Sequence, residues 1–222
     1  MNNIRCKAAI FAGILGLCAS GAALAEPYGL VNGRTADMSR SPAKSVEVGV
    51  GFGEFNDVDY EHYGARFNYK FNPGTVAYAD LGQSSLDGGN EADGLTFGIG
   101  GFWQMDGIFA AADFAIHASF HRVDLDFDGF NSASLSGNSI VVEGVFSGKR
   151  PVNDAGTIYF NGSLGINRQS LDVSGGGSDN ETELTFSGGF VLRTQSNSGE
   201  IYGSVFFVDD LGFGAGYRYF LN

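Results

Sequence analysis

Three residues of the types used in hydrolytic chemistry come together in the middle of the chain. His117 and Ser119 are two positions apart, so on a β-strand both side chains lie on one face. A hairpin centred near residue 130 would place Glu143 opposite His117. A nucleophile, a base and an acid that orients the base form a hydrolase triad. Ser119, His117 and Glu143 are therefore the candidate catalytic residues of this sequence.

Metal chemistry has one candidate, a stretch that contains Asp124, Asp126 and Asp128 followed by Gly129. This spacing matches the first half of an EF-hand calcium loop, but the twelfth position, which should be glutamate, is Leu135. We interpret it as a solvated acidic loop, with weak calcium binding as the alternative. His117 and His121 would lie about 13 Å apart on a strand, which is too far to share zinc. We expect no metal and no cofactor.

The segment that best reveals the architecture is 63–71, where every second residue is apolar and the residues between are small or polar. Because strand side chains alternate between faces, this is a ribbon with one apolar and one polar side. The pattern recurs in ten segments, each near the 9–11 residues that a tilted membrane strand needs. The predicted strands are 45–55, 61–71, 75–84, 94–104, 108–122, 138–147, 157–169, 183–193, 200–208 and 212–221.

The apolar faces of these segments contain almost no charge. A lipid-facing Lys or Arg near the bilayer midplane costs about 2–4 kcal/mol, which explains the exclusion. Aromatic side chains at one end form a candidate interfacial girdle, namely Phe71, Trp103, Tyr219 and Phe220. The sequence therefore predicts an all-β protein, a transmembrane antiparallel up-and-down β-barrel of about ten strands.

The connections between the segments alternate in length. Tight turns with glycine at 72–74 and 105–107 suit the periplasmic side, and long acidic stretches at 85–93, 123–137 and 171–182 suit the outside. The Asp209-Asp210 hairpin is short although it would lie outside. An eight-stranded barrel with two segments misassigned therefore stays open as an alternative.

The N-terminal region divides into two parts. Residues 1–25 have a basic start, an apolar run and an Ala23-Leu24-Ala25 cleavage site, as in an exported signal peptide that is removed. Residues 26–44 are interpreted as a periplasmic leader, with a partial plug as the alternative, and 45–222 as the barrel. Removal of the signal takes away both cysteines, and it takes the formal net charge from −12 to −14 because it removes two cations and no anion. That charge argues against binding nucleic acid.

The chain resembles the small outer-membrane β-barrels of the OmpA and OmpX kind in its signal peptide and its strand pattern. It also resembles them in the stretch from Gly214 to Phe220, where aromatic residues alternate after a glycine. The resemblance implies a location in the outer membrane of a Gram-negative envelope and insertion by the barrel-assembly machinery. It also implies contact with outer-membrane lipid and lipopolysaccharide, and it implies no catalytic residue. Separately, His117-Ala-Ser119 is similar to the His-x-Ser of outer-membrane phospholipases, whose pair faces lipid, whereas here it faces inward.

Polar side chains on the inward faces should pair, because an unpaired buried charge is costly to desolvate. Hairpin geometry about Pro73 places Arg66 opposite Asp80 and Asn68 opposite Tyr78. The predicted network of the lumen is Glu47 near Lys70, Arg218 near Glu47 once the barrel closes, Arg66 with Asp80, and His117 with Glu143.

Three functions remain open at this level. The first is a non-enzymatic structural barrel or passive small-solute pore, which we expect. The second is an outer-membrane lipid hydrolase that uses Ser119, His117 and Glu143. The third is an adhesion or surface-recognition protein that acts through its acidic outer loops.

Overall fold

The structure, a computed structural model, describes residue 30 and ranges 33–55, 58–87, 92–109, 112–127, 134–152, 156–174, 177–194, 198–207 and 211–221. The predicted signal peptide, Asp128 and the Asp209-Asp210 hairpin lie outside these residues.

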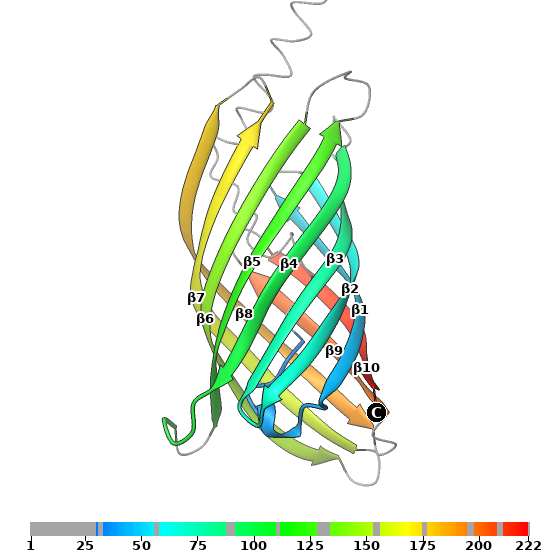
Figure 1. Cartoon of the computed structure of the whole chain (residues 1–222), viewed down its shortest axis with the longest axis vertical. Helices are drawn as coiled ribbons and strands as arrows, with labels where there is room; N and C mark the ends of the chain where they lie inside the picture. Colours follow the sequence, from blue (N-terminus) through cyan, green and yellow to red (C-terminus); the bar gives the residue numbers. More distant parts are fainter. Residues whose placement is uncertain are drawn as a thin grey trace, which may run out of the picture.

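Ten antiparallel strands close into one barrel in which each strand pairs with its neighbours in the sequence and β1 pairs with β10 (Figure 1). The prediction of a ten-stranded up-and-down barrel is confirmed, and the eight-stranded alternative is wrong. The strands are β1 Lys44–Phe55, β2 Val58–Asn72, β3 Thr75–Asp87, β4 Ala92–Gln104, β5 Asp113–Phe127, β6 Ser134–Val152, β7 Gly156–Val173, β8 Ser178–Thr194, β9 Gly199–Phe207 and β10 Leu211–Leu221.

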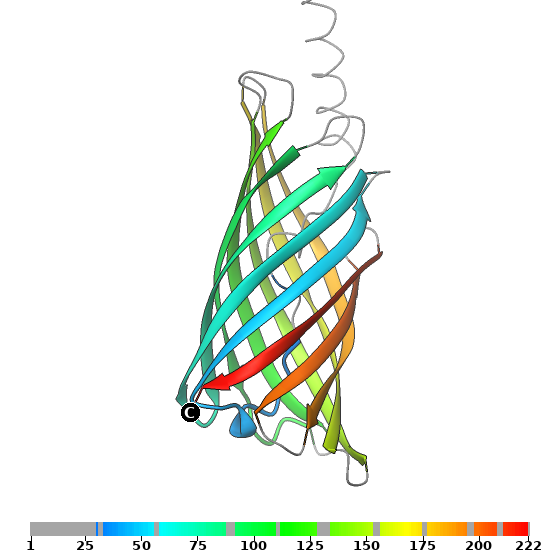
Figure 2. The same ribbon diagram turned by 90° about the vertical axis from the view of Figure 1, so that its right-hand side faces the viewer.

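The two ends of the barrel differ. The plug end is the end at which β1 begins, β10 ends and the two-residue hairpin between Asn72 and Thr75 lies. The far end is the opposite one. Figure 2 shows that β9 and β10, in orange and red, stop well short of the tips of β6 and β7 at the far end. The barrel is therefore taller on one side.

Several predicted boundaries were wrong. Strand β5 begins at Asp113 rather than 108, because a turn with Gly107 at φ +77° precedes it. Gly107 has the left-handed backbone expected of a turn glycine, whereas Gly74 does not. At the far end the strands continue into the predicted loops 85–93, 123–137 and 171–182.

The outward face forms an apolar belt to which every strand contributes. Examples, one per strand, are Val48, Phe67, Leu81, Phe97, Ile116, Val142, Leu164, Phe186, Ile201 and Tyr217, each at least 36% exposed. Three members of the predicted aromatic girdle, Phe71, Trp103 and Tyr219, lie on this surface, but Phe220 points inward and is buried. An exposed apolar surface of this extent fits a hydrocarbon solvent rather than water.

The far-end extension reverses this polarity. It comprises residues 59–61, 85–87, 92–94, 123–127, 134–137 and 171–174, and its apolar side chains face inward. Buried there in one cluster are Tyr60, Leu86, Ala92, Val123, Leu125, Phe127 and Leu135, with Leu171 and Val173 packed against them. The exposed positions between them are mostly acidic or polar, such as Asp124 and Asp126. This arrangement is that of a soluble β-protein.

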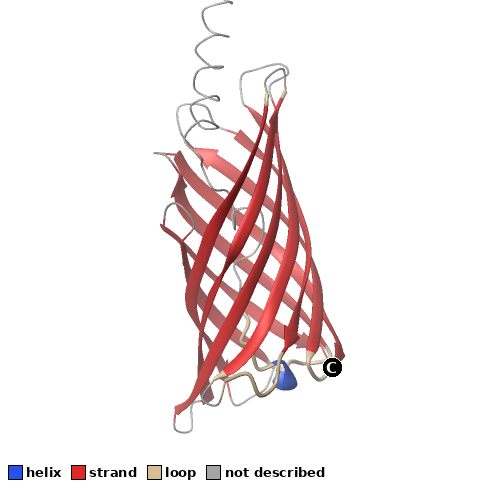
Figure 3. Ribbon diagram, turned by 90° about the vertical axis from the view of Figure 1, so that its left-hand side faces the viewer, coloured by secondary structure: helices blue, strands red, loops and turns tan. Residues whose placement is uncertain are grey.

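The plug segment, residues 33–41, lies inside the plug end. It contains the short 3₁₀ helix η1 (Met38–Arg40), drawn in blue at the lower rim in Figure 3. Ala36 and Met38 are buried against Val76, Phe102 and Val145 of the barrel wall, in a cluster that also holds Tyr78 and Ala115. The described part of 26–44 is therefore a partial plug and not a loose leader. No helix among the described residues is long and apolar enough to cross a membrane.

Candidate functional site

The lumen between the plug segment and the far-end cluster carries a layer of buried charged side chains. Adjacent strands β2 and β3 supply its simplest pair, because the register places Arg66 directly opposite Asp80. Arg66 Nε and Nη2 donate to Asp80 Oδ2 at 2.9 and 2.8 Å, and His121 Nε2 lies 3.4 Å from the same oxygen. The pairing of Arg66 with Asp80 is present as predicted from the Asn72-Pro73-Gly74 turn.

Glu47 is the centre of a second network. Its Oε1 accepts from Arg34 Nη2 at 3.0 Å, Asn68 Nδ2 at 2.7 Å and Arg218 Nε at 2.6 Å. Arg218 also pairs with Glu200, which accepts from Arg193 Nε at 2.7 Å. Closure of β1 on β10 thus produces the predicted Glu47–Arg218 contact.

The predicted proximity of Glu47 to Lys70 is wrong. The register places Glu47 opposite Arg66, four positions from Lys70 along β2. Lys70 lies at the rim, where its Nζ donates to the carbonyl oxygens of Ser39 and Ser41 at 2.8 and 3.1 Å. The lysine therefore holds the plug segment rather than the carboxylate.

The candidate triad is only partly assembled. His117 Nδ1 lies 2.8 Å from Glu143 Oε1, as predicted from the β5–β6 hairpin. His117 Nε2, which a triad needs next to the nucleophile, is instead 2.8 Å from the Tyr78 hydroxyl. The Ser119 hydroxyl hydrogen-bonds to that same Tyr78 oxygen. The tyrosine thus stands between Ser119 and the imidazole, so His117 is not placed to take the serine proton.

Packing further restricts His117. Its ring stacks on Phe102 with centroids 4.3 Å apart, and Tyr78 lies under the Arg66 guanidinium at 4.1 Å. Both ring nitrogens and one ring face are therefore in contact with protein. The group is a structural part of the lumen wall.

The metal candidates among the described residues are not gathered into a site. Asp124 and Asp126 lie on the outward face of strand β5 and not in a loop, and Asp124 is paired with Arg122 at 2.7 Å. His117 and His121 both face the lumen, four residues apart on one face of β5, with separate partners. Among the described residues no three His, Cys, Asp or Glu side chains are grouped to hold a metal ion. The interpretation of this stretch as a loop was wrong for Asp124 and Asp126, because the alternation of Val, Asp, Leu, Asp and Phe extends the strand.

Side chains from six strands hold the plug segment and the adjoining Leu30, mostly through backbone atoms. Carbonyl oxygens of Leu30, Gly33, Arg34, Ser39 and Ser41 accept from Arg66, Arg218, Asn161 and Lys70. The amides of Ala36 and Met38 donate to Ser147 Oγ at 3.0 Å and Gln104 Oε1 at 2.8 Å. The Arg34–Glu47 ion pair completes the set. A segment anchored around the barrel therefore occupies the plug end.

Sequence reasoning missed Arg34, Gln104, Ser147, Asn161 and Glu200 as members of this site. Four of them are inward positions of predicted strands, and the inward phase of each strand could have identified them. Arg34 had no such signal, because the segment around it has no sustained period.

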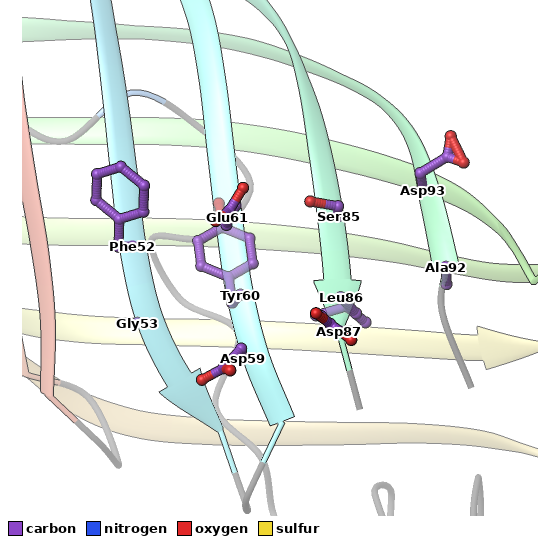
Figure 4. Close-up of a pocket in the computed structure, with 10 residues that line it drawn as sticks. All are labelled: Phe52, Gly53, Asp59, Tyr60, Glu61, Ser85, Leu86, Asp87, Ala92 and Asp93. Atoms are coloured by element: carbon purple, nitrogen blue, oxygen red, sulfur yellow. The ribbon is translucent and has the colours of Figure 1, made fainter. Parts of the chain in front are cut away.

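A cavity of about 480 Å³ lies at the far ends of β1 to β4 (Figure 4). Four carboxylates line it, those of Asp59, Glu61, Asp87 and Asp93, and further lining residues include Phe52 and Tyr60. The cavity belongs to the far-end extension and is separate from the charged layer of the lumen.

Comparison with protein families and with curated proteins found no match for the sequence. Among solved structures, the chain is similar to a loop-deletion mutant of OmpT, an outer membrane protein of Vibrio cholerae, at 17% identity and a TM-score of 0.40. That match covers 81% of this chain and 60% of OmpT, so the chain spans less than two thirds of that protein. It is also similar to the translocator domain of the autotransporter NalP from Neisseria meningitidis, at 13% identity and a TM-score of 0.44, covering 99% of this chain and 98% of the domain.

Proposed function

We propose that the chain is a non-enzymatic outer-membrane β-barrel, closed in its resting state, that acts as a structural scaffold for its far-end extension. The plug end faces the periplasm and the far-end extension stands outside the membrane. The belt that all ten strands expose supports the membrane location. The predicted export signal and the C-terminal aromatic motif support the outer membrane, assembly by the barrel machinery, and an OmpA/OmpX-like type. The surrounding lipid, including lipopolysaccharide, is then the main partner of the belt.

One observation carries the closed state. The charged side chains of the lumen are buried, with Glu47 at 0%, Glu143 at 2%, Arg66 at 3% and Asp80 at 4% exposure. In an open water-filled pore such side chains would be exposed to solvent. A passive small-solute pore would therefore require that part of the protein that fills the lumen move out first.

The same geometry supports a non-enzymatic role. A lipid hydrolase needs its nucleophile next to the base and open to the bilayer. Ser119 is buried on the inward face, and Tyr78 occupies the position at His117 Nε2. Substrate lipid outside the barrel has no route to this group through the strand wall.

The experiment is reconstitution of the mature protein, residues 26–222, into planar bilayers and vesicles. We expect heat-modifiable migration, partition with outer membranes in cells, and no steady conductance in bilayers. Recovery as a soluble periplasmic species, or a permanently open channel, would contradict the proposal.

Surface recognition is the second candidate, and strand register favours it. Asp59 lies directly opposite Asp87, and Asp93 directly opposite Asp126, all exposed. Like charges directly opposite one another destabilise a sheet, so these pairs reduce stability unless a cationic partner uses them. Replacing all four with asparagine should abolish binding to a cationic surface without loss of folding if recognition is the role. Unchanged binding would contradict surface recognition, and the scaffold role would then be the remaining function.

A further inference from the structure

Strand β8 is paired on one side only over its far-end part. Its pairing with β7 runs from Ser178 to Thr194, which is its whole length. On the other side its pairing with β9 ends at Phe186, opposite Phe207. Residues 178–185, which we call the β8 edge, therefore have no described strand beside them on that side. In Figure 1 this part of β8, in gold, forms the left margin of the upper barrel.

The β8 edge is accessible as well as unpaired. Residues 178–182 are all exposed, and Leu184 is 68% exposed. The backbone N–H and C=O groups along an unpaired edge are a template to which another extended chain can form hydrogen bonds. When a strand is added in this way, the main-chain hydrogen bonds supply affinity and the alternate side chains supply specificity.

The plug end has a second unpaired edge, but its residue types differ. Strand β6 continues to Val152, whereas its pairing with β5 reaches only Ser147, so residues 148–152 have no described strand beside them there. This edge contains Lys149 and Pro151, and lysine and proline are residue types that discourage the addition of another strand. The β8 edge contains neither lysine nor proline.

The β8 edge carries its charge on one face. Thr185 is fully buried on the inward face, and every second residue before it shares that face. These residues are Asp179, Glu181 and Glu183, and residues 178–185 include no cationic side chain. A strand that pairs with this edge therefore meets a row of three carboxylates on one face.

The carboxylates select the kind of strand that can pair. Residues directly opposite each other in two antiparallel strands lie on the same face of the sheet. A second copy of this edge, added antiparallel about a two-fold axis, would place acidic residues opposite acidic residues, which destabilises the pairing. A segment with lysine or arginine at alternate positions would instead form opposite-charge pairs, which stabilise it.

We propose that the β8 edge is a docking site for an extended cationic polypeptide segment, which pairs with residues 178–185 as an additional strand. Its lysine or arginine side chains lie on the inward face, opposite Asp179, Glu181 and Glu183. The proposal rests on the proposed membrane orientation, in which the far end stands outside and the partner comes from outside the cell. It does not involve the paired aspartates of β2 to β5 on which surface recognition was proposed.

The test measures binding of a synthetic peptide of alternating threonine and lysine to the folded mature protein in detergent micelles. Two analogues keep the charge but carry methyl groups on the backbone nitrogens of either all threonines or all lysines. Only one of these two rows of N–H groups can face β8. We therefore expect one analogue to bind more weakly than the parent peptide on the order of tenfold, and the other to bind like the parent. Amide hydrogen exchange within residues 178–185 should slow when the parent peptide binds.

The contribution of charge is tested by Asp179→Asn combined with Glu181→Gln. This variant leaves Glu183, which accepts a hydrogen bond from Gln169 at 3.3 Å. We expect the affinity for the peptide to fall about two- to thirtyfold, because two opposite-charge pairs across strands are lost.

The matched control is Asp59→Asn combined with Asp87→Asn. It removes the same number of charges from exposed, directly opposite positions of β2 and β3. This variant should bind the peptide like the wild type.

Four results would overturn the docking site and leave the membrane barrel intact. They are absence of peptide binding to the folded protein, equal affinities of the two methylated analogues, and unchanged hydrogen exchange in residues 178–185. The fourth is loss of binding in the control variant but not in the Asp179 and Glu181 variant, because the peptide would then bind at β2 and β3.

The orientation on which the proposal rests is tested separately with Thr182→Cys, at an exposed position of the β8 edge. Residues 26–222 contain no cysteine, so this thiol is the single one in the mature variant. A membrane-impermeant thiol reagent should label it on intact cells. Labelling only after the cells are lysed would overturn the outward orientation of the far end, and with it a partner from outside the cell.

Discussion

Strand β5 crosses two regions of the molecule whose inside and outside are exchanged. Towards the plug end its inward side chains include His117, Ser119 and His121, and its outward side chains are apolar, such as Ile116 and Phe120. Beyond residue 121 the inward positions become Val123, Leu125 and Phe127, whereas the outward ones become Arg122, Asp124 and Asp126. The alternation continues without interruption, but its polarity inverts.

The exchange shows that the solvent around the strand, and not the strand itself, decides which face is apolar. In hydrocarbon the outward side must be apolar and the lumen can be polar, whereas in water an apolar interior stabilises the fold. Strands β6 and β7, of 19 and 18 residues, are longer than the 9–11 residues that a tilted span needs, which leaves room for both regimes.

The largest effect is expected in the charged layer of the lumen. Asp80→Ala should destabilise the barrel by about 3–5 kcal/mol, because it leaves Arg66 buried without its carboxylate. The paired change Arg66→Met with Asp80→Leu should cost clearly less. Urea unfolding in vesicles, followed through the single tryptophan Trp103, measures both. Equal losses would mean that the lumen is hydrated enough to screen an unpaired charge.

The second-largest effect is expected in the apolar belt. Strand β7 offers a test position and a control position on the same outward face. Leu164→Arg should cost about 2–4 kcal/mol of folding into lipid, because it places a charge in hydrocarbon. Ser170→Arg, outward on β7 beyond the belt, should have little effect. The ratio of the folded to the unfolded protein band after reconstitution measures how well each variant folds into lipid. Similar damage from the two would remove the distinction between belt and extension.

The interior of the far-end extension should respond as a soluble core does. Val123→Ala, at a fully buried position, should cost about 1–3 kcal/mol, and Ser136→Ala on the outward face close to nothing. Proteolysis of reconstituted protein from the outer side is the suitable measurement, since it detects local loosening. A Val123→Ala protein as resistant as the wild type would argue against an apolar core there.

The smallest effect is expected at Ser119. Ser119→Ala removes one hydrogen bond to Tyr78 and should change stability by about 1 kcal/mol or less. No lipid-hydrolysing activity should distinguish the variant from the wild type. An esterase activity present in the wild type and lost in this variant would restore the catalytic hypothesis.

Much of the fold was predictable because a period of two is a strong signal when one face must be apolar. The Arg66–Asp80 and His117–Glu143 contacts followed from the hairpins alone. The far-end strand extensions were missed although they alternate equally well. The polar residues of these extensions were interpreted as loops. Their apolar residues fall on the inward face instead of the outward one, and next to three aspartates this pattern resembles a solvated acidic segment.

The plug was beyond the reach of a periodicity argument. Its residues form neither a strand nor a long helix, and several of the contacts that fix them join positions more than 60 residues apart in sequence, such as Met38 with Gln104 and Ala36 with Ser147. Only the closed barrel brings those partners together. For the same reason the position of Tyr78 between Ser119 and His117, which removes the triad, required the tertiary structure.

The exchange of polarity along β5 is tested most directly by single cysteines on its outward face, each labelled with an environment-sensitive fluorophore and exposed to a quencher attached to lipid chains. The positions are Phe114, Ile116, Ala118, Phe120, Arg122, Asp124 and Asp126. We predict strong quenching through residue 120 and a sharp fall from residue 122 onwards. Quenching that stays uniform along the whole strand, or that is absent at all seven positions, would contradict the account.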